Sequence, residues 1–176
     1  LVEQATNRRD DMATLRAELR ARFTTVVEKA REGGATEFFI GLELVPGIPL
    51  PAWAVVFPVD ENRLQLESVS FSDLPRGLDF AVGEAPDGGE REVSDDVDSR
   101  IHAVRHAWRR TASAGDGETT FDMFEVDYWL AAANPNRVAL VTFSTALAEY
   151  EEEMSDLFDA VIGTLVWPAP TDAVSA

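Results

Sequence analysis

Residues 119–130 read TTFDMFEVDYWL, an alternation of apolar and polar side chains that is typical of a half-buried β-strand. The large apolar side chains on one face are Phe124, Val126, Tyr128 and Leu130. We therefore expect a strand that buries this face in the core of a sheet.

The preceding segment, Ser99 to Arg110, is compatible with two structures. In a helix, Ile101, Val104 and Trp108 would share a face, whereas in a strand successive residues would point to opposite faces. Propensity alone leaves both structures open. Because the loop at 113–116 leads directly into the strand at 119–130, we expect a strand here and an antiparallel hairpin between the two runs.

A tight turn in which Ser113 faces Asp116 sets a register that places His102 opposite Asp127. One face of the hairpin would carry His102, His106, Trp108, Glu125, Asp127 and Trp129. The other would carry Ile101, Ala103 and Ala107 with the apolar residues of 119–130. The first set is the candidate binding surface.

Further strands are predicted at 36–44, 52–59, about 64–71 and 137–144. The run 52–59 (AWAVVFPV) is apolar on both faces, which suits a central strand that is covered on both sides. A short turn separates it from 64–71, so we expect these two strands to form an antiparallel hairpin.

The remaining connections are rich in Pro, Gly and acidic residues. Segment 45–51 (VPGIPLP) cannot form a helix or a central strand, because its prolines lack the backbone N–H. Residues 72–84 are ambiguous, with a short strand at 78–82 as one option. Residues 85–99 combine a Pro-Asp-Gly-Gly sequence with a run of acids, which predicts an exposed loop.

Two amphipathic helices are predicted near the ends of the chain. Residues 11–32 place apolar side chains at steps of three and four, and Gly33-Gly34 provides a helix stop. Residues 146–163 repeat the pattern, with Ser144 or Thr145 as the N-cap. Glutamates crowd the early turns of this second helix, where negative charge suits the helix dipole.

These elements predict an α+β fold: a largely antiparallel sheet of about six strands, flanked by an N-terminal and a C-terminal amphipathic helix in an α/β/α sandwich. The strands follow one another too closely for several parallel crossovers. We expect residues 1–167 to form a single domain and residues 168–176 to be a frayed C-terminal tail.

The C-terminal part has a recognisable pattern: Tyr128-Trp129-Leu130, then RVALVTFST at 137–145, then apolar positions from Met154 to Trp167. This pattern resembles the ending of bacterial PsbP-like domains, a group with a Mog-type α/β/α sandwich that includes secreted lipoproteins and uncharacterised proteins. The resemblance covers the C-terminal third and implies a strand, a helix packed on the sheet and a tail with Trp. It also implies a domain that works by binding other proteins. Unlike the secreted relatives, this chain has no Cys that could carry a lipid.

The composition excludes several classes of function. Among 176 residues, 15 Lys and Arg stand against 32 Asp and Glu, a formal net charge of −17, which argues against binding of a nucleic-acid backbone. The absence of Cys excludes disulfides and thiolate chemistry. No nucleophile elbow, P-loop or dinucleotide glycine pattern occurs, and no apolar run approaches the roughly 20 residues that cross a bilayer. We expect no cofactor and no metal.

The two histidines offer the only candidate chemistry. A His102–Asp127 pair could act as a general base, and Glu125 or Asp127 could join His102 and His106 around a metal ion. The alternative, which we favour, is that these residues form cross-strand pairs on a half-solvated sheet.

We expect a non-catalytic protein-interaction or ligand-binding domain whose partner is another protein; a homo-oligomer is also compatible with the sequence. One alternative is an acidic inhibitor or immunity-type protein that neutralises a basic partner. A further alternative is a small hydrolase that uses His102, His106 and Asp127. No basic segment followed by an apolar run starts the chain, which predicts a cytoplasmic location unless an export signal precedes Leu1.

Overall fold

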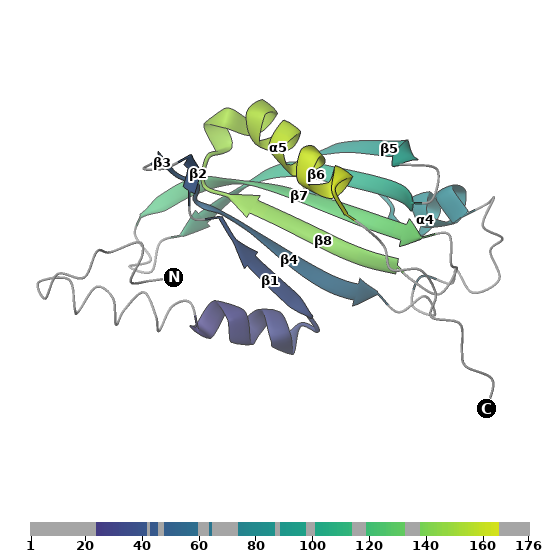
Figure 1. The fold of residues 1–176 in the computed structure, drawn as a ribbon, viewed down its shortest axis with the longest axis horizontal. Helices are drawn as coiled ribbons and strands as arrows, with labels where there is room; N and C mark the ends of the chain where they lie inside the picture. Colours follow the sequence, from purple (N-terminus) through teal and green to yellow (C-terminus); the bar gives the residue numbers. More distant parts are fainter. Residues whose placement is uncertain are drawn as a thin grey trace, which may run out of the picture.

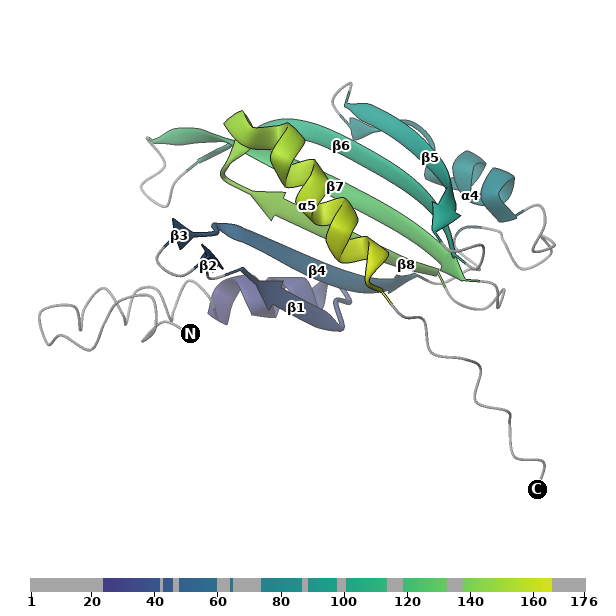
Figure 2. The same cartoon turned by 45° about the horizontal axis from the view of Figure 1, so that its top comes forward.

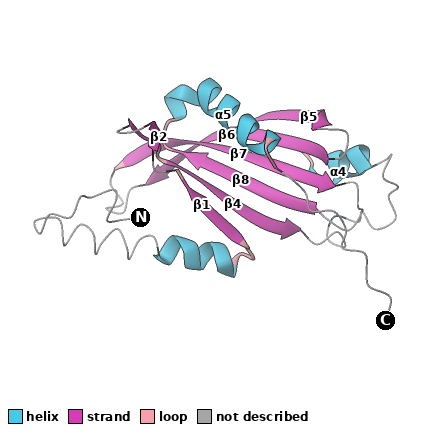
Figure 3. Ribbon diagram, viewed as in Figure 1, coloured by secondary structure: helices cyan, strands magenta, loops and turns pink. Residues whose placement is uncertain are grey.

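The computed structural model describes residues 24–41, 43–45, 48–59, 64, 74–86, 89–97, 101–113, 119–132 and 138–165. Its centre is one antiparallel sheet of six strands in the order β1-β4-β8-β7-β6-β5, and together with its helices this makes an α+β fold (Figures 1 and 3). The strands of this sheet are β1 (Glu37–Ile40), β4 (Ala52–Val59), β5 (Glu90–Val97), β6 (Ile101–Ser113), β7 (Thr120–Ala132) and β8 (Val138–Thr145).

The helices lie before, between and after the strands. A first helix is described from residue 24 to residue 32. The others are α4 (Leu74–Val82), the 3₁₀ turn η4 (Ala148–Tyr150) and α5 (Glu151–Gly163). The short strands β2 (Glu43–Val45) and β3 (Ile48–Pro49) pair with each other in a separate small sheet. In the described part of the chain, no helix combines the length and the apolarity that a bilayer span requires.

The predicted strands that form the middle of the sheet are confirmed. The segment 52–59 is β4 and lies between β1 and β8, as its two apolar faces require. Residues 101–110 of the ambiguous segment 99–110 belong to strand β6, and 138–144 of the predicted strand 137–144 belong to β8. Strands β5 to β8 follow one another along the chain and pair in that order.

The expected hairpin register is wrong by four residues. His102 lies opposite Ala131, not Asp127, and Asp127 lies opposite His106. The reason is the length of the two strands: β6 runs on to Ser113 and β7 starts at Thr120, and these two residues pair with each other, whereas the expected register paired Ser113 with Asp116. Since four is an even number, the shift leaves every side chain on the face that the alternation predicted.

Two other expectations about the strands are wrong. The predicted strand 36–44 is not one continuous strand: β1 ends at Ile40, although the amide of Gly41 still donates to the carbonyl of Ala52 in the same register, and Glu43 belongs to the separate strand β2. The hairpin between 52–59 and 64–71 cannot form, since both edges of β4 are already paired with β1 and β8. Of residues 60–73, only Leu64 is described.

Two segments have a different secondary structure from the one expected. The possible strand at 78–82 is the second half of α4, whose Leu78 is fully buried. The expected loop at 85–99 contains β5, an edge strand paired with β6. Its acidic side chains suggested a loop, but charges are also usual on an exposed sheet edge, where they oppose pairing with another chain.

The predicted C-terminal helix is confirmed, with a later start. Ser144 and Thr145 belong to β8, and the Thr145 hydroxyl accepts a hydrogen bond of 3.1 Å from the amide of Leu147 in the turn before η4. The regular helix then begins with Glu151 and two more glutamates in its first turn. Of the predicted helix 11–32, residues 11–23 lie outside the described part of the chain, as does the tail 168–176.

Each of two apolar clusters packs a helix against the sheet. Figure 2 shows α5 lying diagonally over β7 and β8, where its buried residues Met154, Phe158 and Ile162 join the larger cluster. In this cluster the ring of Phe143 stacks on Phe158 at 4.5 Å and meets the edge of Tyr128 at 5.6 Å. On the alternate residues of the same strands, Leu78 of α4 packs against Val104, Ala131 and Val138. The sheet is therefore apolar on both faces.

Candidate functional site

The six residues of the predicted binding surface do share one face of the sheet. Their register places Trp108 opposite Glu125 and His106 opposite Asp127 on β6 and β7, with His102 and Trp129 further along the same face. This face is not an open surface, however. His106 is 3% exposed, and Trp129 packs on the Leu78 cluster beneath α4.

Asp127 is the residue of this face with the most altered acidity. Burial raises the pKa of Asp127 to about 6, partly offset by a hydrogen bond of 2.6 Å that the Thr142 hydroxyl donates, while nearby Glu125 raises it further. The carboxyl is therefore held by β8, its other neighbour in the sheet, and not by a histidine.

His106 faces Asp127 but is poorly suited to act as its charged partner. Burial lowers the pKa of His106, and the Arg91 guanidinium lowers it further, against smaller opposing effects from the Gly83 backbone and Glu84. In the described part of the chain, His106 Nε2 is buried without a hydrogen-bond partner. The pair that the sequence suggested as a general base, His102 with Asp127, is not assembled, because His102 lies opposite Ala131.

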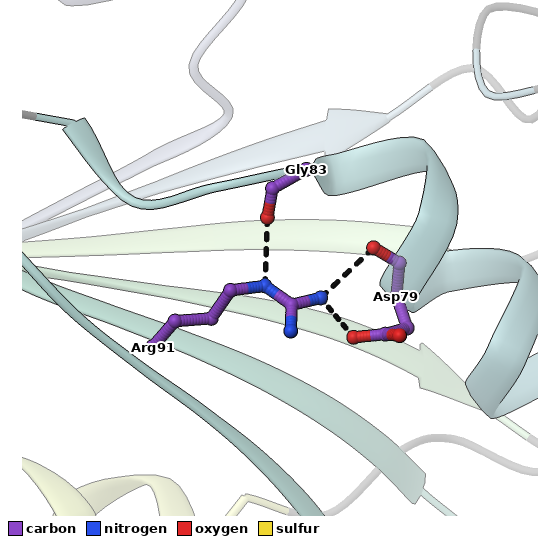
Figure 4. Close-up of polar contacts among 3 residues, drawn as sticks. All are labelled: Asp79, Gly83 and Arg91. Carbon is purple, nitrogen blue, oxygen red and sulfur yellow. Dashed lines mark hydrogen bonds and ion pairs between the residues drawn. The ribbon is translucent and has the colours of Figure 1, made fainter.

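Arg91 anchors α4 to this end of the sheet. Its Nε donates to the carbonyl of Gly83 at 2.7 Å, and a terminal nitrogen donates to the carbonyl of Asp79 at 2.9 Å and to the Asp79 carboxylate (Figure 4). The guanidinium thus binds carbonyl groups at the end of the helix, where the Asp79 carbonyl otherwise accepts only a long hydrogen bond of 3.4 Å from the amide of Gly83. These hydrogen bonds tie α4 to β5 and hold the helix over this face of the sheet.

No metal centre is found in the described ranges: nowhere in them do three His, Asp or Glu side chains gather closely enough to hold an ion. The distances between the two His and the acids of the β6–β7 face therefore do not support the metal arrangement that the sequence allowed.

An apolar groove lies on the α5 side of the sheet, and it was not predicted. It has a volume of about 400 Å³ and runs between α5 and strands β1, β4 and β8. Its floor includes Ala54, Val141 and Phe143, and its walls include Phe39 of β1 with Leu157 and Val161 of α5. None of the described residues that line it is charged.

The groove is open to solvent along its rim. Phe39 is 53% exposed and Val161 is 47% exposed, although both are large apolar residues next to a core. Because burying such a side chain is favourable by about 1.5–3 kcal/mol, two of them on facing walls make this groove a candidate site for apolar contact.

A second depression of about 570 Å³ lies on the other side of α5 and is polar. Its walls carry Arg105 and Arg109 of β6 together with Glu151, Ser155 and Asp156 of α5. Arg109 Nε bonds Glu151 at 2.6 Å, and Arg105 contacts the Ser155 hydroxyl. Helix α5 therefore separates an apolar groove from a surface of ion pairs.

Signals for the groove were present in the sequence. Phe39 interrupts the polar side of the alternation at 36–44, and Val161 widens the apolar stripe of the C-terminal helix. Each residue alone is an unremarkable exposed apolar side chain. Only the pairing of β1 with β4, and of β4 with β8, brings Phe39 to the same groove as α5.

No protein-family model, curated protein or solved structure matches this chain.

Proposed function

We propose that this chain is a non-catalytic interaction domain that binds a partner protein by taking its apolar side chains into the groove between α5 and β1, β4 and β8. The observation that carries the proposal is the uncharged groove of about 400 Å³, whose volume lies within the range of ordinary binding sites. The side chains of Phe39 and Val161 on its rim are exposed and therefore available for contact with a partner.

The arrangement of polar groups favours binding over catalysis. The groove holds no charged side chain, and the candidate catalytic residues lie on strands β6 and β7, on the opposite face of the sheet. His106 is 3% exposed, so a substrate could not reach it without displacing α4. A hydrolase that uses His102, His106 and Asp127 is therefore the weaker alternative.

The acidic inhibitor is the second candidate, and a specific feature supports it. Helix α5 carries Glu151, Glu152 and Glu153 in its first turn and no Lys or Arg along its length. An interaction driven mainly by this charge would lose association rate steeply with salt, whereas one driven by the groove would keep its dissociation rate.

The overall architecture forms part of the proposal. We propose that the helix at 24–32 and α5 form the outer layers of an α/β/α sandwich, as in PsbP-like domains. In support, Val27 and Ala30 are partly buried, while their neighbours on that helix are exposed.

The test uses an amphipathic peptide with Leu on one face and uncharged Gln on the other, so that only apolar contact is measured. We expect saturable binding by calorimetry with a negative heat-capacity change. The double variant Phe39→Ser/Val161→Ser should weaken binding at least about tenfold, the loss expected when interface contacts worth 1.4 kcal/mol are removed.

The matched control is Phe80→Ser, which removes a 90% exposed aromatic residue from α4, away from the groove. This variant should bind the peptide like the unmodified chain. Equal binding by the groove variant and the control would contradict the proposed function.

A further inference from the structure

Resting on the proposed function, we propose that the partner segment that occupies the groove is a basic amphipathic helix. Its apolar face would enter the groove, and Lys or Arg side chains on its flanks would meet carboxylates on the rim. The juxtaposition of an uncharged groove with acids on both of its walls supports this inference.

Each wall of the groove has a carboxylate next to a rim residue. Glu37 lies two residues before Phe39 on β1 and on the same face of that strand. Glu153 lies four residues before Leu157 on α5 and hence on the same side of the helix. Both glutamates are exposed, so both can meet a charge brought by a partner.

Among the described residues, the two arginines on this face of the sheet lie away from the groove and are paired with acids. Arg105 and Arg109 stand on β6, across α5 from the groove, where Arg105 Nε is 3.5 Å from Asp159 and Arg109 Nε is 2.6 Å from Glu151. Within the described ranges, β1 and α5 contain no Lys or Arg at all. A fatty acid or an anionic lipid would therefore place its negative group near acids without a counter-charge.

The shape of the groove favours a helix over a small ligand. Its two rim residues, Phe39 and Val161, are each about half exposed, so the groove resembles an open channel between a helix and a strand and not an enclosed cavity. Open apolar grooves of this kind bind amphipathic helices through residues spaced at i, i+3, i+4 and i+7. Flanking positive charges would add long-range attraction to a chain of net charge −17.

Three peptides with one Leu face and a polar face of Lys, Gln or Glu test this inference. We expect the Lys peptide to bind roughly tenfold tighter than the Gln peptide at low salt and the Glu peptide to bind weakest, with the differences shrinking as salt is added. The double variant Glu37→Gln/Glu153→Gln should remove most of the advantage of the Lys peptide and leave the Gln peptide unchanged.

The control variant Glu28→Gln/Glu84→Gln removes the same amount of charge from two exposed positions outside α5 and β1. It should keep most of the preference for Lys. If it lowers Lys-peptide binding as much as the rim variant does, net charge and not the rim is responsible, and the inference is overturned.

The remaining outcomes separate the two proposals. If all three peptides bind alike and Phe39→Ser/Val161→Ser still abolishes binding, the basic partner is wrong and the groove function stands. If that groove variant leaves binding of every peptide unchanged, the proposed function itself fails. Competition of oleate or zwitterionic vesicles for the groove, or self-association of the chain lost in the groove variant, would also overturn the basic helix as occupant.

Discussion

Tyr128 on strand β7 donates its hydroxyl hydrogen to the carboxylate of Asp159 on α5. The tyrosine is 3% exposed. Its ring packs against Phe143 in the apolar core, and its hydroxyl points from the core toward the polar side of the helix. Arg105 lies close to the same carboxylate. This contact ties α5 to β7 on the side of the helix that faces away from the groove.

The substitution Tyr128→Phe tests that contact. The ring packing remains and Asp159 can still meet water and Arg105, so we expect the free energy of unfolding to fall by about 1 kcal/mol, the usual net value of one hydrogen bond. Urea denaturation measures this loss. Tyr150→Phe is the matched control, because Tyr150 is 50% exposed, and it should be neutral.

Asp127→Asn should stabilise the protein at neutral and alkaline pH. The pKa of Asp127 in the fold, about 6, lies above its ordinary value of 3.8, so folding favours the protonated carboxyl. The stability from this group is complete below pH 3.8 and is lost as the pH rises through 6. The variant escapes this loss, which we expect to amount to roughly 1–3 kcal/mol at pH 8, since one unit of pKa corresponds to 1.36 kcal/mol.

The check is a series of melting curves from pH 4 to pH 8. The difference between Asp127→Asn and the unmodified chain should grow between the two pKa values. Asp122→Asn removes the same charge from an exposed position on the same strand and serves as the control. A destabilised Asp127→Asn variant at pH 8 would contradict the account of the buried carboxyl.

Arg91→Lys should loosen α4 selectively. An ammonium cannot reproduce the planar guanidinium that spans Asp79 and the carbonyl of Gly83, so we expect a loss of roughly 1–2 kcal/mol in the stability of this helix. Hydrogen exchange should quicken at α4 amides and change little in α5. Arg76→Lys, at an exposed position of α4, should leave exchange unaltered.

Two glycines should differ in their tolerance of alanine. At Gly89 an added Cβ would lie 2.3 Å from the carbonyl oxygen of Ala107, so the start of β5 must shift, and we expect a cost of roughly 2–3 kcal/mol from overpacking. At Gly83 the space is open but φ is +72°, a conformation that costs alanine about 1 kcal/mol. The melting temperature of Gly89→Ala should therefore be lower than that of Gly83→Ala. The reverse order would show that the first residues of β5 can shift at little cost.

Local alternation was enough to identify the strands of the sheet centre and the faces of their residues. Phe124 and Val126 on one side and Glu125 and Asp127 on the other follow from a period of two, which survives any even shift of register. The register itself was not accessible. It depends on where β6 ends and β7 starts, and the small and acidic residues of 114–118 do not determine that.

The order of the strands was also hidden in the sequence. Segment 90–97 carries so many acids that local reasoning favoured a loop, and only pairing with β6 stabilises it as a strand. The helical structure of Leu78 depends likewise on the cluster with Val104 and Val138, which are distant in the chain. The groove could not be predicted for the same reason: only long-range strand pairing brings Phe39 and Val161 to facing walls of one groove.

The position of β4 has a consequence for biosynthesis. This strand pairs with β8, whose residues are translated some 80 to 90 positions later, as the partnership of Ala54 with Phe143 illustrates. On the ribosome, the edge of β4 that pairs with β8 must therefore stay unpaired until β8 has emerged, while β5, β6 and β7 can already pair with their neighbours. The β4–β8 seam can close only after β8 has been synthesised, and α5, which follows β8 in the chain, can cover this face of the sheet only after that.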